Sequence, residues 1–259
     1  MISQAKIKLI HSLESKKGRS KEGAFVAEGP KVVSDLMAVM RPRFIIATDE
    51  WLEKNNVEEV EAFAVTDSEL RKISYLQHPQ QVIAVFPIPA SEKTLESNGN
   101  AMATFDANSL CLALDGVQDP GNLGTIIRIA DWFGIETIYC SHETVDVYNP
   151  KVVQATMGSI ARVKVLYVDL ARFIDNLPKD YPVYGTLLDG KDIYRQQLST
   201  RGMIVMGNEG KGLSSIIKQK VTHRLLIPNY PPCRETADSL NVAVATAITC
   251  SEFRRRSMN

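Results

Sequence analysis

Residues 109–133 read SLCLALDGVQDPGNLGTIIRIADWF, and this stretch decides the fold of the larger part of the chain. Its beginning, 109–117, is a nearly continuous apolar run, which is typical of a strand buried on both faces of a parallel sheet. Asp119-Pro120-Gly121-Asn122 then turns the chain, and the apolar spacing that follows predicts a helix over about 123–133. A buried strand, a short turn and a helix form the repeating unit of an α/β domain.

The same alternation continues to the C-terminus, where a long last helix is expected from Leu240, so that 109–259 is predicted to be a doubly wound α/β domain. Residues 1–100 predict a smaller α/β unit of strands and helices, preceded by a basic amphipathic helix near 3–14 and a loop over 15–23. The polar stretch 90–108 contains Asn98-Gly99-Asn100 and shows no periodicity, which predicts a linker.

The composition excludes several classes of protein. Apolar residues make up 44% of the chain and charged residues 23%, close to the averages of globular proteins. No apolar run approaches the 18 or so residues that span a bilayer, and the N-terminus lacks the apolar core of a secretory signal. We therefore expect a cytoplasmic protein without a membrane partner. The four cysteines have no metal-ligand spacing, so buried thiols are expected and no metal site.

Charge is unevenly distributed although 30 basic residues balance 30 acidic ones. Residues 1–31 hold seven Lys and Arg against three acidic residues, whereas 32–109 hold six against twelve. A phosphate-binding surface must therefore be local. The basic segment Lys16 to Lys21 is one candidate for contacts with phosphates, with a solvated loop as the alternative.

Three glycine-bearing turns follow predicted strands, and ligands of open α/β sheets bind at such strand ends. The first is Asp119 to Asn122, with Gly124 in the helix after it. It lacks the G-x-G-x-x-G pattern of dinucleotide-binding proteins. Arg128 follows among apolar neighbours, so we expect it to lie among buried residues and to need an anionic partner.

The second turn is Gly207-Asn208-Glu209-Gly210-Lys211-Gly212, in which glycines on both sides of a carboxylate allow the backbone to approach a ligand. It lacks the spacing of a P-loop, which disfavours ATP hydrolysis. The third stretch runs from Ile227-Pro228 to Ser239-Leu240-Asn241, where the last helix begins.

Together these motifs resemble the SpoU, or TrmH, family of RNA ribose 2′-O-methyltransferases. The resemblance spans essentially all of 109–259, and the order of the three motifs is highly specific. Residues 1–90, with Lys17-Gly18-Arg19 and the run FVAEGP, are similar to the N-terminal substrate-binding domain of many members. Further matches are Asn149-Pro150, Ala155 with Met157-Gly158, and Thr186-Leu187 with Asp189-Gly190.

The resemblance implies a C-terminal α/β domain with a deep trefoil knot, which binds S-adenosylmethionine, and a smaller N-terminal α/β RNA-binding domain. It also implies a homodimer built partly from the first and last helices of the C-terminal domain, with the active site near the interface. The loops of the knot would hold the adenine largely through backbone groups. In this chain those loops map to Thr186, Leu187, Gly207, Ile227 and Leu240.

Methyl transfer from a sulfonium needs positioning and deprotonation of the attacking hydroxyl rather than a metal. The base proposed for the family aligns with Arg128, but a guanidinium is an awkward base. Arg128 is therefore expected to clamp the substrate phosphate and hydroxyl, and either a phosphate oxygen or a perturbed Arg128 would take the proton. The residues expected to orient Arg128 and the ribose are Asn122, Glu209, Ser239 and Asn241, with Glu209 paired to Arg128 or to a loop amide.

The chain departs from the family pattern at 229–238, NYPPCRETAD, where many members have a short glycine-containing loop. This difference leaves the substrate open. Ribosomal RNA is favoured over tRNA because of the accessory domain, since structured RNA is recognised by shape and exposed loops. The alternatives are a tRNA 2′-O-methyltransferase and an inactive RNA-binding protein of the same fold. A nucleotide-dependent oxidoreductase is disfavoured by the missing fingerprint.

Overall fold

The computed structural model describes residues 2–89, 102, 105–231 and 237–257. The chain divides into two compact units, of which the first comprises Met1–Ala90 and Asp146–Ala161 and the second Ser91–Val145 and Arg162–Asn259. The expected linker at 90–108 lies mostly outside the described residues, so the division into domains 1–100 and 109–259 stays a prediction. The sequence did not predict that the segment 146–161 belongs to the first unit.

The first unit contains a four-stranded mixed sheet in the order β1-β4-β2-β3, with β4 antiparallel to both of its neighbours. The helices that follow β1 and β2 return the chain to the same edge of the sheet, which accounts for the parallel pairing of β2 with β3 but not for the reversed β4. The elements are α1 (Gln4–Ser12), α2 (Lys16–Glu22), β1 (Ala24–Glu28), α3 (Pro30–Met37), β2 (Phe44–Ala47), α4 (Asp49–Lys54), β3 (Ala62–Ala64), α5 (Asp67–Ile73) and β4 (Val82–Pro87).

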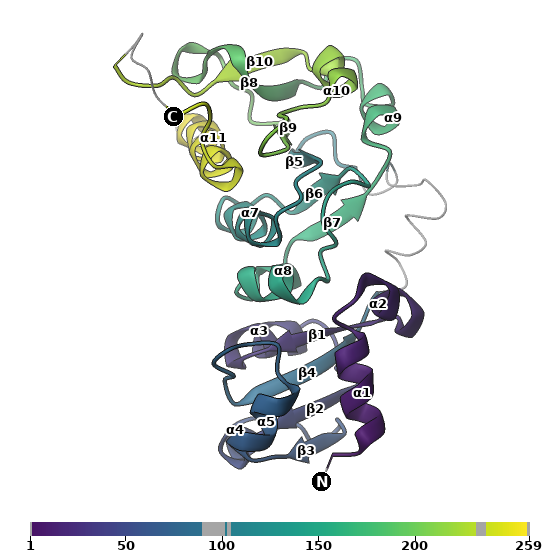
Figure 1. The fold of residues 1–259 in the computed structure, drawn as a ribbon. Coiled ribbons are helices and arrows are strands. Elements are labelled where there is room, and N and C mark those ends of the chain that lie inside the picture. Colours follow the sequence, from purple (N-terminus) through teal and green to yellow (C-terminus); the bar gives the residue numbers. More distant parts are fainter. Residues whose placement is uncertain (1, 90–101, 103–104, 232–236, 258–259) are drawn as a thin grey trace. The chain divides into compact units, whose positions relative to one another are not determined.

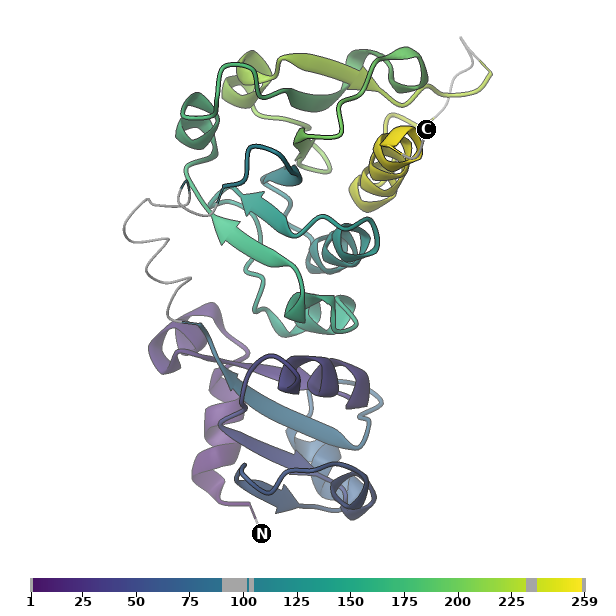
Figure 2. The same cartoon turned by 180° about the vertical axis from the view of Figure 1, so that it is seen from behind.

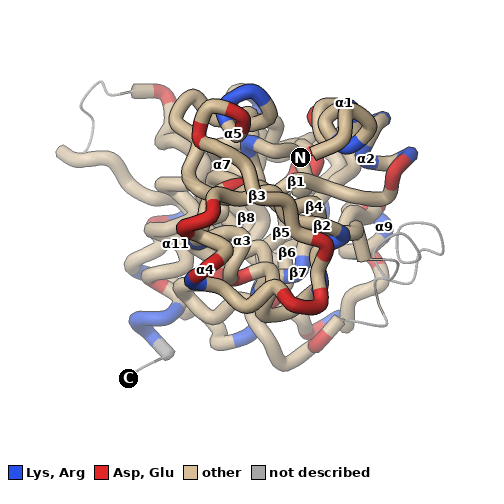
Figure 3. The backbone as a smooth tube through the Cα atoms, turned by 90° about the horizontal axis from the view of Figure 1, so that it is seen from below, with Lys and Arg blue, Asp and Glu red and all other residues tan. Residues whose placement is uncertain are grey.

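Helices cover both faces of this sheet. Helices α1 and α5 lie on one face, where Ile10, Leu13, Leu70 and Ile73 pack against alternate strand residues. Helices α3 and α4 lie on the other face, which is nearer in the view from behind (Figure 2). The continuous burial of the central strands follows from this double cover. Acidic positions gather along α4 and the loop after it (Figure 3).

The expected basic loop over 15–23 is wrong, because residues 16–22 form helix α2. The Ser15 side chain accepts a hydrogen bond from Gly18 N at 3.0 Å and so caps its N-terminus. Gly23 ends the helix with φ 59°, the left-handed conformation that glycine adopts without strain. The helix turns Arg19 inward, where only 2% of the residue is exposed. Arg19 is therefore not available to RNA phosphates.

The segment 146–161 contains two short helical elements. It forms α8 (Pro150–Ala155) and then a single 3-10 turn, η2 (Ser159–Ala161). Met157 and Gly158 between them adopt φ 50° and 96°, which a continuing α-helix does not allow. Helix α8 packs against β1, and η2 packs against α3.

The second unit contains a six-stranded sheet in the order β10-β8-β9-β5-β6-β7, and every neighbouring pair is parallel. The expected α/β fold with a parallel sheet is thus confirmed. Its elements are β5 (Leu110–Asp115), α7 (Pro120–Trp132), β6 (Thr137–Cys140), β7 (Lys164–Tyr167), α9 (Leu170–Asp175), β8 (Val183–Asp192), η3 (Ile193–Arg195), β9 (Gly202–Gly207), α10 (Ser215–Lys220), β10 (His223–Leu226) and α11 (Val242–Ser257).

Helices α7 and α11 lie side by side on one face of this sheet, and α9 and α10 lie on the other (Figures 1 and 2). Arg254 of α11 donates to the carbonyl oxygens of Phe133 and Gly134, which follow α7. The trefoil knot stays a prediction, because strand order alone does not define how the chain threads. In the part of the chain that the structure describes, no helix has the length and apolar character needed to span a membrane.

Candidate functional site

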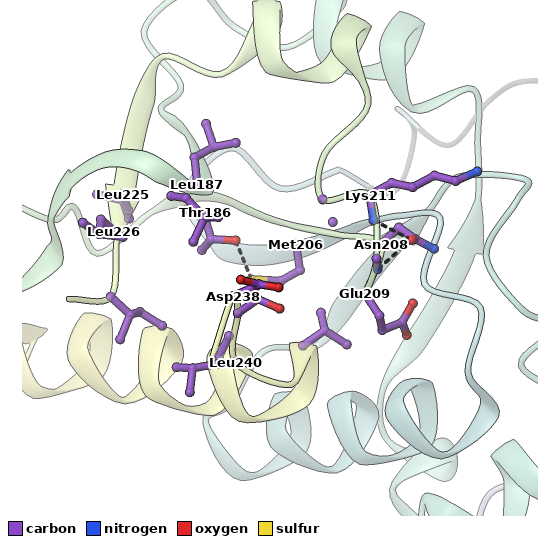
Figure 4. A pocket seen from close by; sticks show the side chains of 18 of the residues that line it. Thr186, Leu187, Met206, Asn208, Glu209, Lys211, Leu225, Leu226, Asp238 and Leu240 are labelled. Carbon is purple, nitrogen blue, oxygen red and sulfur yellow. Dashed lines mark hydrogen bonds between the residues drawn. The ribbon is translucent and has the colours of Figure 1, made fainter. Parts of the chain in front are cut away.

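A cavity of about 460 Å³ lies in the second unit, where β9 and β10 end and the last helix begins. Its size is within the usual range of small-molecule sites. Leu187, Leu225, Leu226 and Leu240 give it apolar walls, and Asn208, Glu209 and Lys211 lie at its other end (Figure 4). The position agrees with the rule that ligands of parallel α/β sheets bind beyond the carboxyl ends of the strands.

All five residues expected to hold the cofactor line this one cavity, although they come from four separate parts of the chain. The Thr186 hydroxyl lies 3.6 Å from the Met206 sulfur and 3.4 Å from the carbonyl oxygen of Val205. The lining thus combines aliphatic side chains with backbone groups of strand-end loops, which suits a flat heteroaromatic ring recognised by its edge. The five residues are Thr186, Leu187, Gly207, Ile227 and Leu240.

The turn after β9 forms the polar end of the cavity. A Cβ at Gly207 would lie 2.3 Å from the backbone carbon of Gly212, so the close approach of these two segments requires glycine. The side-chain Oδ1 of Asn208 accepts from Gly210 N and Lys211 N, both at 3.0 Å, and its Nδ2 donates to Gly116 O at 2.7 Å. Asn208 was not among the residues predicted for the site, although its place between two glycines of the turn was a signal for it.

Three of the predicted catalytic residues form one hydrogen-bonded row. Asn122 Nδ2 donates to Glu209 Oε1 at 3.0 Å, and Asn241 Nδ2 donates to Asn122 Oδ1 at 2.9 Å. Asp119 begins α7 by accepting from Asn122 N at 2.8 Å, so the helix starts at Pro120, three residues earlier than expected. Glu209 therefore pairs with Asn122 rather than with Arg128 or a loop amide.

Arg128 is placed differently from the prediction. It lies on the exposed face of α7, and no hydrogen bond or ion pair of its side chain is found within the described residues. Its neighbours Ile126, Ile127 and Ala130 are buried as expected. Because successive helix residues are turned by about 100°, residue 128 faces outward while the others face the sheet. Its guanidinium is available to an anion from outside the unit.

Ser239 also lines the cavity, at the end of the loop that replaces the family's short one. Residues 232–236 of this loop lie outside the described residues. Tyr230 before them is 87% exposed. Asn241 Oδ1 accepts from Ala243 N at 2.9 Å and so lies at the N-terminus of α11. The helix begins at Val242, two residues after the expected start at Leu240.

The described cysteines are buried, and the other possible metal ligands do not cluster in the described part of the chain. Burial raises the pKa of Cys111 and of Cys250 to about 12, and it raises the pKa of Cys140 too, so these thiols stay protonated at neutral pH. Cys233 lies outside the described residues. No group of three or more His, Cys, Asp or Glu side chains that could hold a metal ion occurs among the described residues.

Two family models match the chain. Residues 109–251 match the SpoU rRNA Methylase family, and residues 4–84 match the MRM3-like substrate binding domain. The first match contains the cavity and the row of Asn122, Asn241 and Glu209.

Whole-chain comparisons agree with these matches. The chain is 31% identical over 255 residues to the 23S rRNA (guanosine(2553)-2'-O)-methyltransferase RlmP of Bacillus subtilis, with 96% of each chain covered. A putative RNA methyltransferase of the TrmH family from Porphyromonas gingivalis is 39% identical, with a TM-score of 0.84 and 99% of each chain covered. An AdoMet-bound rRNA methyltransferase from Sinorhizobium meliloti is 28% identical, with a TM-score of 0.83 over 99% of this chain and 96% of that one.

Proposed function

Because the chain belongs to the SpoU rRNA methylase family, it is an S-adenosylmethionine-dependent RNA ribose 2′-O-methyltransferase, and we propose that its substrate is ribosomal RNA. The relative RlmP acts on 23S rRNA by its name, and residues 4–84 resemble a substrate-binding domain. A tRNA substrate is the alternative. A cytoplasmic location stays a prediction.

The observation that carries the proposal is the position of the cavity beside the polar row. The cofactor supplies an electrophilic methyl group on a sulfonium. Thr186, Leu187, Gly207, Ile227 and Leu240 line a space that fits its adenosine part. Asn122, Glu209 and Asn241 lie at the other end, where an attacking ribose would have to be oriented.

We assign the residues of the row to orientation and Arg128 to the substrate. Asn122 is held from both sides, so its position is determined before RNA binds. Arg128 has no partner in the described chain and fits the expected role of a clamp on the phosphate and hydroxyl. A substrate phosphate oxygen suits the role of proton acceptor better than a guanidinium, which has no lone pair to accept a proton.

The proposal includes a homodimer through α7 and α11. The two helices lie side by side, and each exposes apolar side chains, with Trp132 85% and Val244 49% exposed. These exposed apolar side chains support the proposal, because an interface between two copies would remove them from water. A dimer there would bring Arg128 of α7 close to the interface.

Transfer of radiolabelled methyl from S-adenosylmethionine tests the proposal directly. The substrates are ribosomal RNA and tRNA from cells that lack this protein, followed by nuclease mapping. Label in a nuclease-resistant, ribose-methylated dinucleotide of ribosomal RNA is the expected result. Label in tRNA alone would move the substrate to the alternative. Cofactor binding without label in either RNA would favour a binding protein of this fold.

A further inference from the structure

The segment 146–161 leaves the second unit after Val145 and returns to it at Arg162, but it packs within the first unit. In the sequence it lies between β6 and β7, two strands of the second unit's sheet. The first unit is therefore joined to the catalytic sheet by the two ends of this segment as well as by the chain after residue 90. The contacts of the segment within the first unit determine how rigidly its two ends are held.

Arg19 holds the beginning of the segment. Its Nε and Nη2 donate to Asp146 Oδ2 at 2.9 and 2.6 Å, and its Nη1 donates to the carbonyl oxygens of Leu13 and Glu14 at 2.9 and 2.7 Å. Only 3% of the Arg19 side chain and 17% of the Asp146 side chain are exposed. The guanidinium thus joins the end of α1 to the first residue of the segment, in a place where water screens the charges little.

The rest of the segment is anchored as well. Asp146 Oδ1 accepts from Tyr148 N at 3.0 Å, which shapes the turn into α8. The Tyr148 ring lies 4.6 Å from the Phe25 ring of β1. At the far end, a Cβ on Gly158 would lie 2.2 Å from Asp35 Oδ2 of α3, so the backbone lies directly against that helix.

On the other side of Asp146, the chain is hydrogen-bonded to the loop after β5. Val145 N donates to Val117 O at 2.9 Å, and Ser141 Oγ accepts from Gly116 N at 3.0 Å. Gly116 O in turn accepts from Asn208, the residue that shapes the turn carrying Glu209. A short run of bonds therefore leads from Asp146 to the polar row of the active site.

We propose that Arg19 and Asp146 are positioning residues, whose ion pair fixes the end of the segment 141–146 and, through its backbone, residues 114–122 of the active site, where β5 leads into α7. This inference rests on the proposed function for its effect on catalysis. The pair acts through the backbone of 141–146 and touches neither cofactor nor ribose. Its loss is expected to lower turnover on RNA and to leave the cofactor cavity, which lies around residues 186, 207, 227 and 240, unchanged.

The test compares Asp146→Ala with Asp180→Ala in the full chain. Asp180 is a matched control, because its ion pair with Arg201 has the same 2.6 Å distance but Asp180 is 74% exposed. Asp146→Ala is expected to lower kcat on ribosomal RNA by about 10-fold or more, a typical loss for a misplaced catalytic group, with the Kd for S-adenosylhomocysteine within about twofold. Asp180→Ala is expected to change neither. Asp146→Asn, which keeps the size and one acceptor oxygen, is expected to show a smaller loss in the same direction.

Hydrogen exchange separates this inference from the proposed function. Peptides covering 114–122 are expected to exchange faster in Asp146→Ala than in the wild type, while peptides of α10 stay unchanged. Unchanged exchange at 114–122 in a folded Asp146→Ala protein would overturn the inference, as would an unchanged kcat. A wild-type protein that binds the cofactor but methylates neither RNA would overturn the proposed function. The exchange result would still decide whether the Arg19–Asp146 pair stabilises residues 114–122.

Arg19→Met tests the pair from its other side. In a double-mutant cycle with Asp146→Ala, the loss in kcat of the double variant is expected to be smaller than the product of the two single losses, because both single variants break the same interaction. Independent losses would show that the two residues act separately and would overturn the inference.

Discussion

Arg19 and Arg128 carry the same charge in opposite surroundings. Arg19 of the first unit is 2% exposed and donates to Asp146 and to two carbonyl oxygens. Arg128 of the second unit is exposed and finds no polar partner within the described chain. The sequence predicted a basic loop open to phosphates around Arg19, and an Arg128 that lies among buried residues and needs an anionic partner.

The difference separates charges that stabilise the fold from charges that are left for a substrate. A buried guanidinium must be paired by the protein itself, because an unpaired buried ion is strongly unfavourable. An exposed guanidinium contributes little to stability and keeps its hydrogen-bonding capacity for an anion. Loss of Arg19 should therefore affect folding first, and loss of Arg128 should affect catalysis alone.

The largest expected effect is that of Arg128→Ala on methyl transfer. We expect kcat/KM on RNA to fall by about 1,000-fold or more, in the range of a lost acid–base or clamping group. The Kd for S-adenosylhomocysteine and the Tm should stay unchanged, because the residue is exposed and its side chain has no hydrogen bond or ion pair within the described chain. Steady-state kinetics, calorimetric titration and thermal unfolding give the three values.

Arg128→Lys is the control for that variant, since a lysine keeps the charge but not the planar fork. A partial recovery of activity would assign the effect to charge. If Arg128→Ala lowered cofactor affinity and Tm together with activity, Arg128 would be a structural residue and the comparison with Arg19 would no longer hold.

Arg19→Met is expected to have the next largest effect, this time on stability. Removing one partner of a buried ion pair leaves Asp146 uncompensated, so the free energy of unfolding should fall by about 3 kcal/mol or more. Urea unfolding, followed by a probe in the first unit, measures the change. Lys21→Met on the same helix is the matched control, because 81% of its side chain is exposed. Equal stability of Arg19→Met and Lys21→Met would remove the contrast between the two arginines.

These two arginines also show where prediction from the sequence ends. The alternation of strands and helices predicted the α/β fold, and the family resemblance identified five of the residues that line the cavity. The surroundings of Arg19 were not predictable, because Asp146 lies 127 positions away in the sequence. Arg128 faces outward because Ile126, Ile127 and Ala130 form the buried face of α7, whereas its apolar neighbours in the sequence had favoured burial.

The pairing within the site was hidden for the same reason. Glu209 lies 87 positions from Asn122, and only the fold brings the end of β9 to the start of α7. The motifs identified both residues, but not which of them touch. Periodicity and turn chemistry are local signals, whereas the satisfaction of a polar side chain depends on contacts between distant segments.

Asn122 is intermediate between the buried Arg19 and the exposed Arg128, because it is half-buried and hydrogen-bonded on both sides. Asn122→Ala is therefore expected to affect both activity and stability. Because Asn122 orients other groups without carrying charge, we expect kcat to fall by about 30-fold, less than for Arg128. The free energy of unfolding should fall by about 1 kcal/mol, the scale of a neutral hydrogen bond. Asn122→Asp, which keeps the shape but repels Glu209, is expected to be less active than Asn122→Ala at neutral pH. Higher activity of Asn122→Asp would contradict an orienting role through Glu209.

The smallest expected effect concerns Glu28, a buried carboxyl that is satisfied by neutral groups instead of an ion. Tyr75 N donates to Glu28 Oε1 at 2.9 Å and the Ser74 hydroxyl donates to Oε2, but burial raises the pKa of Glu28 above its ordinary value of 4.5. The native state then binds a proton more readily than the unfolded state does. The free energy of unfolding should therefore fall as pH rises from about 4.5 through the raised native pKa, and level off above it.

Glu28→Gln should remove this slope while changing stability at neutral pH by less than about 1 kcal/mol. Urea unfolding at a series of pH values measures it. Glu69→Gln is the control with the opposite sign, because hydrogen bonds from Thr66 lower the pKa of Glu69, so that its contribution to stability is lost as pH falls below 4.5. If Glu28→Gln kept the wild-type slope, hydrogen bonds from neutral groups would stabilise a buried charge as well as a paired ion does. The ion pair of Arg19 would then be no more than one way among several to bury a charge.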